Sequence, residues 1–212
     1  MTKNSEPRAF ITQYMRLLPA PSVPEISLYT AHPGSGLWRL LGRDNDTPPY
    51  WAYHWAGGTV LARYILDRPE TVAGKRVIDL GTGSGIVGIA AAQSGAIRVV
   101  AIDIDPLAVV ATSLNAERNG VTLHAVCADI LTGPPPQADL ILVGDLFYAP
   151  SLAEAVLPFL KMCRSADIDV LIGDPGREPL PRADLQLLAN YPVADFGDPC
   201  ESAPRISGVY AL

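Results

Sequence analysis

The chain has 212 residues, of which 49% are hydrophobic and 18% charged, and its formal net charge is −6. This length and composition are typical of one soluble domain with a sizeable core. The lack of a basic run argues against a nucleic-acid partner, and the lack of a run of ~18 apolar residues argues against a membrane span. Three cysteines and three histidines are scattered along the chain, without the spacing of a metal site.

Residues 1–48 are interpreted as an N-terminal extension and residues 49–212 as one α/β domain. The extension is predicted to start with a loose segment at residues 1–9 and a short helix at residues 10–18. An edge strand at residues 26–29 and loops at residues 32–36 and 44–49 are expected to follow.

Residues 49–58 contain four aromatic rings in six positions, which is more than expected by chance in a chain with 7% aromatic residues. The rings could form a packed lid over the sheet, or Trp51 or Trp55 could border a ligand. Packing is favoured for Tyr50, and both interpretations stay open for Trp55. An amphipathic helix is predicted directly after this segment, over residues 59–66.

From residue 77 onward, short apolar runs alternate with helical segments, as in a doubly wound sheet. Strands are predicted at residues 77–80, 98–103, 123–128, 138–144 and 170–173, and helices at residues 86–92, 106–119, 151–164 and 182–190. Two further strands, at 191–196 and 206–210, have no room for a crossover helix between them and are expected to pair antiparallel. The predicted fold is an α/β, Rossmann-like seven-strand sheet, mostly parallel, with an antiparallel C-terminal hairpin and helices on both faces.

Five acidic residues are expected at the carboxyl ends of the predicted strands, namely Asp79, Asp103, Asp129, Asp145 and Asp174. One such acid is often only a turn residue or a helix cap. Five along one rim are harder to explain in that way, and ligands of open α/β sheets bind outside these strand ends. The rim is therefore the candidate ligand site.

The turn after the first core strand has the pattern Asp79-x-Gly81-x-Gly83-x-Gly85. Glycines permit a sharp turn and the close approach of a ligand, and Asp103, at the end of the next strand, suits the hydroxyls of a ribose. Residues 83–88 also match a dinucleotide fingerprint. The acid before the first glycine favours S-adenosylmethionine instead, because that molecule carries a cationic ammonium and sulfonium, whereas a carboxylate would repel a pyrophosphate.

This turn resembles the first motif of the seven-strand, Rossmann-like methyltransferases, and Asp145-Leu-Phe-Tyr148 is similar to the Asp-x-x-Tyr motif of the protein-lysine methyltransferases in that group. Within the group, the segments 49–58, 79–85, 103–106, 144–148 and 171–177 closely resemble the electron transfer flavoprotein β-subunit lysine methyltransferases. The resemblance spans residues 48–178. It implies an S-adenosylmethionine-dependent methyltransferase domain over residues 49–212, with S-adenosylhomocysteine as the product.

The resemblance also implies two groups of site residues. The cofactor would be lined by Trp55, Asp79, Gly81, Thr82, Gly83, Asp103 and Ile104, with Asp129 beside the adenine amino group. The lysine channel would be lined by the catalytic candidates Asp145 and Tyr148, of which Asp145 is expected to capture and orient the amine. The implied partner is the electron transfer flavoprotein β subunit. The implied source is a bacterium and the expected location cytoplasmic, or the mitochondrial matrix for a mature eukaryotic form.

Two alternatives stay open. Another methyltransferase of this fold could act on a ribosomal protein or on a small amine. The fingerprint at residues 83–88 leaves a nicotinamide-dependent oxidoreductase as an alternative of a different class.

Overall fold

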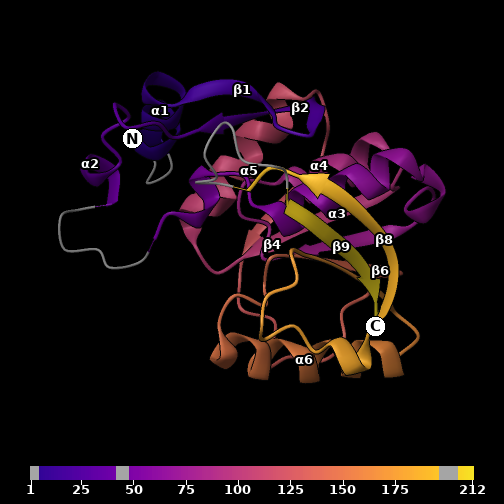
Figure 1. Cartoon of the computed structure of the whole chain (residues 1–212). Coiled ribbons are helices and arrows are strands. Elements are labelled where there is room, and N and C mark those ends of the chain that lie inside the picture. The colour runs from indigo at the N-terminus through magenta and orange to yellow at the C-terminus, as the bar shows by residue number, and fades with distance from the viewer. Residues whose placement is uncertain (1–4, 42–47, 196–204) are drawn as a thin grey trace.

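The structure is a computed structural model that describes residues 5–41, 48–195 and 205–212 (Figure 1). Its centre is a seven-stranded sheet in the order β5-β4-β3-β6-β7-β9-β8. The strands are β3 Arg76–Leu80, β4 Arg98–Asp103, β5 His124–Cys127, β6 Leu140–Gly144, β7 Asp169–Asp174, β8 Gln186–Val193 and β9 Arg205–Ala211. β3 to β7 are parallel, whereas β9 is antiparallel to β7 and to β8. The predicted mostly parallel sheet with an antiparallel C-terminal hairpin is confirmed.

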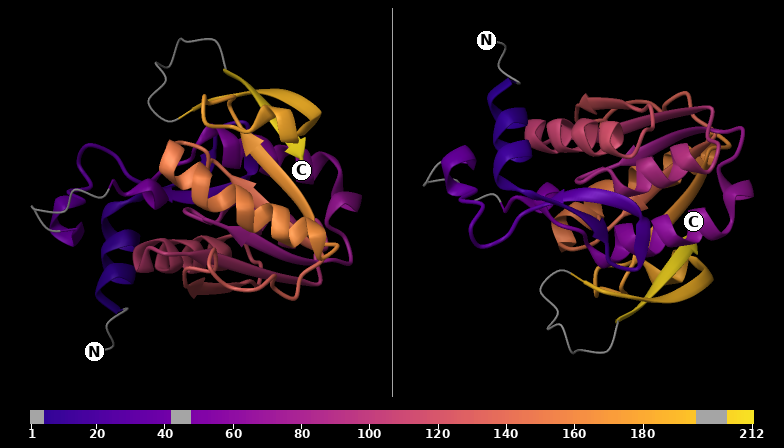
Figure 2. Two further views of the ribbon diagram at one scale, coloured as in Figure 1. Left: turned by 90° about the horizontal axis from the view of Figure 1, so that it is seen from below. Right: turned by 90° about the horizontal axis from the view of Figure 1, so that it is seen from above.

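Helices cover both faces of this sheet, as predicted. They are α3 Ala56–Asp67, α4 Ile86–Gln93 and α5 Pro106–Arg118 on one face and α6 Pro150–Ser165 on the other (Figures 1 and 2). Successive side chains of a strand point to opposite faces, so Leu140 and Leu142 of β6 pack in one apolar cluster, whereas Ile141 and Val143 pack in the other. In the part of the chain that the structure describes, no helix has the length and apolarity to cross a membrane.

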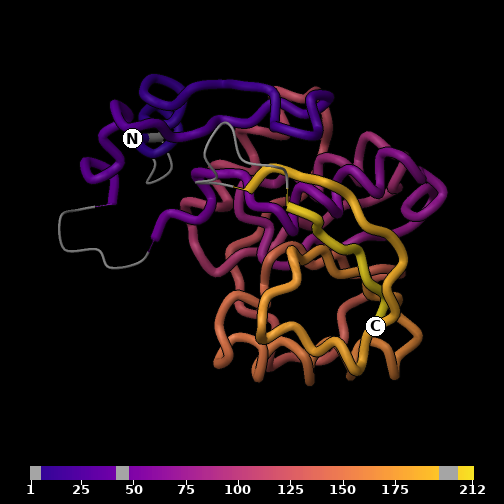
Figure 3. The backbone as a smooth tube through the Cα atoms, viewed as in Figure 1, coloured from indigo at the N-terminus to yellow at the C-terminus, as the bar shows by residue number. Residues whose placement is uncertain are grey.

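The predicted helix at residues 182–190 is wrong. One 3-10 turn, η3 Arg182–Asp184, is followed by β8, which pairs with β9. Figure 3 shows the two strands side by side, in yellow, next to the C-terminus. Leucine and alanine in this segment favour a helix, but pairing with a neighbouring strand overrides that weak preference. The strand predicted at 191–196 therefore begins earlier, and its last residue lies outside the described ranges.

The N-terminal segment also differs from the prediction. Helix α1 Ser5–Tyr14 includes residues that were expected to be loose, and the end of the predicted helix belongs to strand β1 Arg16–Ala20. β1 pairs antiparallel with β2 Val23–Thr30, which contains the predicted strand 26–29. Pro19 is tolerated because β1 is an edge strand of a two-stranded ribbon.

Three short elements connect this ribbon to the sheet: α2 Trp38–Leu41, η1 Tyr50–Ala52 and η2 Pro69–Thr71. The predicted helix at 59–66 is confirmed as part of α3. The loop predicted at residues 44–49 lies mostly outside the described residues.

Asn115 of α5 and Asn119, which caps the C-terminus of that helix, attach the ribbon to the domain. Asn115 accepts a hydrogen bond from the N–H of Tyr29 (2.9 Å) and donates one to the carbonyl oxygen of Ser84 (2.7 Å). Asn119 accepts from the N–H of Ser27 (2.9 Å) and donates to the carbonyl oxygen of the same residue (2.7 Å). The right-hand view of Figure 2 shows α1 at the end of α5. The N-terminal ribbon is thus bonded to the helix that follows β4.

Candidate active site

A cavity of about 610 Å³ opens at the carboxyl ends of β3, β4 and β6. The sheet changes its direction of growth there, because the chain adds β4 and β5 on one side of β3 and then returns to place β6 on the other. Ligands of open α/β sheets bind at such a switch point. The structure brings all ten residues named by the resemblance to this cavity: Trp55, Asp79, Gly81, Thr82, Gly83, Asp103, Ile104, Asp129, Asp145 and Tyr148.

The glycine turn after β3 forms the floor of one half of the cavity. Gly81, Gly83 and Gly85 have backbone φ angles of 68°, 53° and 86°. Residues other than glycine rarely adopt these positive angles. A Cβ on Gly81 would also lie 2.5 Å from a methyl carbon of Leu146. The main chain at this turn is therefore free to contact a ligand directly.

Asp79 is buried at the start of the turn, with 1% of its surface exposed. Its Oδ2 accepts hydrogen bonds from the Thr82 hydroxyl (2.6 Å) and the Gly88 N–H (2.9 Å). Its Oδ1 receives none from the described residues. Burial raises the pKa of this carboxyl from an ordinary 3.8 to about 6, against the lowering effect of the two hydrogen bonds. Asp79 is thus a poorly solvated carboxylate at neutral pH, with one oxygen available to a cationic ligand.

Asp103 holds the turn from the neighbouring strand. Its Oδ2 accepts from the Gly83 N–H (2.9 Å), and its Oδ1 accepts from the Asp105 N–H (3.0 Å). Burial raises the pKa of this carboxyl, and the two N–H groups act in the opposite direction. Each carboxylate oxygen has a second lone pair, so Asp103 can accept hydroxyl donors while it still binds the turn.

Next to Asp103 in the sequence, the lining of the cavity becomes apolar, with one acidic residue, Asp129, beside it. Ile104 is 73% exposed, and it lines the cavity together with Ile130 and Leu131. Asp129 is exposed, and one of its oxygens accepts from the Leu131 N–H (2.9 Å). The arrangement suits a flat heteroaromatic ring with an amino group at its edge.

Aromatic rings also line the cavity. The ring of Tyr50 lies 5.2 Å from that of Tyr148 and 5.7 Å from that of Trp55. The indole N–H of Trp55 donates to the carbonyl oxygen of Tyr50 (2.9 Å), whereas Trp51 is buried with 1% exposure. Packing was favoured for Tyr50, but this ring is 39% exposed, and Trp51 is the buried ring of the segment.

Asp145 also lines the cavity and directly follows β6. It has a left-handed φ of 59°, and its Oδ2 accepts from the Gly58 N–H in the first turn of α3 (2.6 Å). Its Oδ1 accepts a hydrogen bond from the guanidinium of Arg177. Burial raises the pKa of the Asp145 carboxyl to about 6, and the Arg177 charge counters part of this effect. Both carboxylate oxygens therefore have partners within the protein.

Arg177 is the site residue that the sequence did not single out. It lies in the loop after β7, lines the cavity, and contacts the buried Asp174 (3.4 Å) as well as Asp145. Asp174 itself does not line the cavity, although it was expected on the rim. Its Oδ1 accepts from the N–H groups of Gly176 (2.6 Å) and Arg177 (2.7 Å), so it fixes this loop. The only signal in the sequence was the position of Arg177 at the end of the 171–177 motif.

The beginning of α3 approaches the sheet through glycines. A Cβ on Gly57 would lie 2.3 Å from the carbonyl oxygen of Gly173, and one on Gly144 would lie 2.8 Å from the Cα of Gly58. Such distances leave no room for a side chain, so the small residues allow the helix terminus to reach Asp145.

The described residues contain no group of three or more histidine, cysteine or acidic side chains placed to hold a metal ion. Cys127 and Cys163 are free thiols, and Cys200 lies outside the described ranges.

Several known proteins are similar to this chain in sequence. The model of the ribosomal protein L11 methyltransferase (PrmA) family matches residues 57–161. The electron transfer flavoprotein β subunit lysine methyltransferase of Danio rerio is 42% identical over 179 residues, which are 81% of this chain and 69% of the relative. That of Homo sapiens is 40% identical and covers 81% of this chain and 67% of its own length.

A solved structure shows the same architecture. The ribosomal protein L11 methylase from Lactobacillus delbrueckii subsp. bulgaricus matches with a TM-score of 0.54 and 25% identity, over 76% of this chain and 80% of that one. The relatives named for the flavoprotein β subunit are 40–42% identical over 81% of this chain, whereas the L11 family model matches residues 57–161, so these relatives assign the family. The chain belongs to the electron transfer flavoprotein β-subunit lysine methyltransferases.

Proposed function

We propose that this methyltransferase transfers methyl groups from S-adenosylmethionine to lysine side chains of the electron transfer flavoprotein β subunit. The main supporting observation is that one cavity joins the glycine turn at Asp79 to the wall at Asp145 and Tyr148. A methyl donor and an amine must meet in line and at short distance for transfer to occur. The names of the relatives that cover most of the chain support the choice of target.

The residues around the turn fit this cofactor in charge and shape. Asp79 would face its ammonium, Asp103 its ribose hydroxyls, and the apolar surface at Ile104 its adenine, with Asp129 at the ring edge. When bound, the cofactor supplies a methyl group on a cationic sulfonium. A nicotinamide dinucleotide fits less well, because Asp79 at the glycine turn would repel its pyrophosphate.

The other half of the cavity would receive the lysine. An ordinary lysine has a pKa of about 10.4, so only roughly one in 2,500 is neutral and nucleophilic at pH 7. The free energy needed to remove the proton at this pH is about 4.6 kcal/mol. Removal from water lowers the pKa of an amine, and the rings of Tyr50 and Tyr148 would supply such surroundings. An aromatic face also attracts the cationic product of methyl transfer. Asp145 would orient the amine as a hydrogen-bond acceptor.

The direct test is to incubate the protein with labelled S-adenosylmethionine and purified electron transfer flavoprotein, and to map labelled lysines of the β subunit by mass spectrometry. Ribosomal protein L11 is the competing substrate, since the L11 family model matches half of the chain. Label on L11 and none on the β subunit would contradict the proposed target. Label on neither protein, together with stabilisation by NADH, would contradict the methyltransferase chemistry.

Asp145→Asn tests the lysine half of the site. This variant keeps the shape of the side chain and removes its charge, so it should bind S-adenosylhomocysteine almost normally and lose methylation by about 100-fold, because small errors of alignment have such effects. The matched control is Asp184→Asn, an exposed aspartate that pairs with Lys161 at the surface (2.9 Å). Turnover of Asp145→Asn near that of the control would exclude Asp145 from the reaction.

A further inference from the structure

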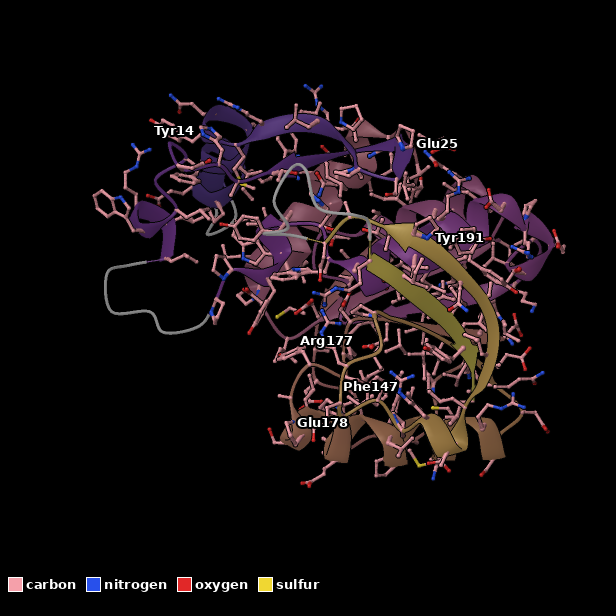
Figure 4. The ribbon with its side chains drawn as sticks, viewed as in Figure 1. Tyr14, Glu25, Phe147, Arg177, Glu178 and Tyr191 are labelled. Atoms are coloured by element: carbon pink, nitrogen blue, oxygen red, sulfur yellow. The ribbon has the colours of Figure 1, made fainter. Side chains whose placement is uncertain are left out.

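The lysine half of the cavity already contains a fixed cation. The guanidinium of Arg177 contacts Asp145 and Asp174, and the Arg177 side chain is 21% exposed. Figure 4 shows Arg177 toward the middle of the molecule, whereas its neighbour Glu178 lies lower, beside α6. A second cation, the ammonium form of a lysine, would therefore enter next to an arginine.

Hydrogen bonds hold this cation in place from the backbone side. The carboxylate of Asp174 is fully buried and accepts from the N–H groups of Gly176 and Arg177. Arg182 donates to the carbonyl oxygen of Gly176 (2.8 Å) from the other side of the loop. The loop that carries Arg177 is thus tied to the end of β7.

Asp145 is equally constrained. One oxygen is bound by the Gly58 N–H at the positive end of the α3 dipole, and the other by Arg177. The charged groups that face this pair are Asp174 from β7 and, farther away, Asp195, which accepts from the Ala56 N–H (3.0 Å). The other acids that line the cavity are Asp79, Asp103, Asp105 and Asp129, and the phenols that line it are those of Tyr50 and Tyr148.

We propose that Arg177 is a positioning residue that balances the charge of Asp145, so that the target amine meets an ion pair instead of an unpaired carboxylate. This inference rests on the proposed lysine methylation. An unpaired carboxylate favours the ammonium form of a nearby amine, and an ammonium has no lone pair for the attack on a methyl group. A carboxylate that is already paired can still accept one N–H of the neutral amine through a second lone pair.

The test is the pH dependence of single-turnover methylation, measured at saturating substrate from about pH 6.5 to about pH 10. The rise of the rate with pH reports the groups that must lose a proton in the bound complex. In Arg177→Gln the rise should move to higher pH by about one unit, as expected when a cation is removed from beside a titrating ammonium. In the double variant Arg177→Gln with Asp145→Asn, the pH of the rise should return most of the way to the wild-type value, and the maximal rate should be lower.

Arg76→Gln is the matched control. Arg76 also forms an arginine–aspartate pair, with Asp139 (2.6 Å), but at the surface near the opposite end of β3. Its profile should coincide with that of the wild type. A lower rate of Arg177→Gln with an unshifted profile, or a shift that the double variant does not reverse, would overturn the proposal and leave Arg177 as a structural residue.

If Arg177→Gln does not fold, Asp145→Asn alone decides the matter. It leaves the Arg177 charge less balanced, so its residual activity should rise at a lower pH than that of the wild type, and an unmoved or higher-pH rise would overturn the proposal. Failure of the proposed target is separate, because the wild type would then not methylate the β subunit at all. The same profiles could be recorded with any other amine substrate that the wild type methylates.

Discussion

Replacement of Asp79 by asparagine should stabilise the protein without cofactor and weaken cofactor binding in the same variant. The two hydrogen bonds to Oδ2, from Thr82 and Gly88, can be kept by the amide oxygen. The amide nitrogen then takes the place of Oδ1, the oxygen without a partner among the described residues. The substitution thus removes a buried charge and leaves the shape of the turn intact.

The magnitude follows from the pKa of Asp79, which burial raises from an ordinary 3.8 to about 6. Between these values the folded protein binds a proton that the unfolded chain has lost, so the free energy of unfolding falls as pH rises from about 4 to about 6 and stays lower above that. A pKa difference of about two corresponds to about 3 kcal/mol. Because the buried amide also has a desolvation cost, we expect Asp79→Asn to raise the free energy of unfolding by about 1–3 kcal/mol at pH 7.5.

Denaturant unfolding of the cofactor-free protein at pH 4.5 and pH 7.5 measures this gain, which should be largest at the higher pH. Asp139→Asn is the control, because Arg76 lowers the pKa of that exposed carboxyl to about 2, and its substitution should give no gain. Calorimetry should show S-adenosylmethionine binding weakened by about 1.5–3 kcal/mol, as for a lost charged hydrogen bond. A variant that is less stable at pH 7.5 and binds the cofactor normally would refute the reasoning.

Substitutions at three further positions, Asp103, Trp55 and Asn115, test other parts of the structure. Asp103→Ala should weaken cofactor binding by about 1.5–3 kcal/mol, and Asp103→Asn, which can still accept from the Gly83 N–H, should lose less; equal affinities of all three proteins in calorimetry would contradict a ribose contact. Trp55→Phe keeps a ring but removes the bond to the Tyr50 carbonyl, so it should lower cofactor affinity with little change in melting temperature; the reverse pattern would support packing alone. Asn115→Ala removes two buried hydrogen bonds and should lower the free energy of unfolding by about 1–3 kcal/mol, while Asn190→Ala, in the C-terminal edge strand, should have a smaller effect in the same assay.

The sequence predicted the core of the fold because its local signals agree with the tertiary structure there. Between β3 and β7, each apolar run is short, each helix has glycine or proline near its ends, and the parallel pairing follows from the alternation itself. The first part of β8, residues 186–190, could not be predicted in this way, because its leucines and alanine favour a helix. The rest of β8 and its antiparallel pairing with β9 were predicted, because the sequence leaves no room for a crossover helix between the two strands.

The site residues also differ in whether local sequence patterns predict them. The cofactor half is built from one turn and the residues after two neighbouring strands, so motif spacing located Asp79 and Asp103. The proposed lysine half includes Arg177, which contacts Asp145, 32 positions earlier, and Asp174. An arginine after a Pro-Gly turn has no distinctive pattern, so its role became visible only from the arrangement in space.

The first turn of α3 explains how the protein stabilises a buried carboxylate at Asp145, in the proposed lysine half of the site. An acidic side chain that is buried at the end of a strand is unfavourable unless donors reach it, and Asp145 obtains one of its donors from the Gly58 N–H. That contact requires the helix to lie closer to β6 and β7 than side chains permit, and the glycines at 57, 144 and 173 provide the space. The aromatic residues just before the helix drew attention in the sequence, but the glycines after them bring a helix terminus, a carboxylate and an arginine together. The acid at Asp145 is therefore best understood as one part of a three-part unit, and its chemistry cannot be inferred from the Asp-x-x-Tyr motif alone.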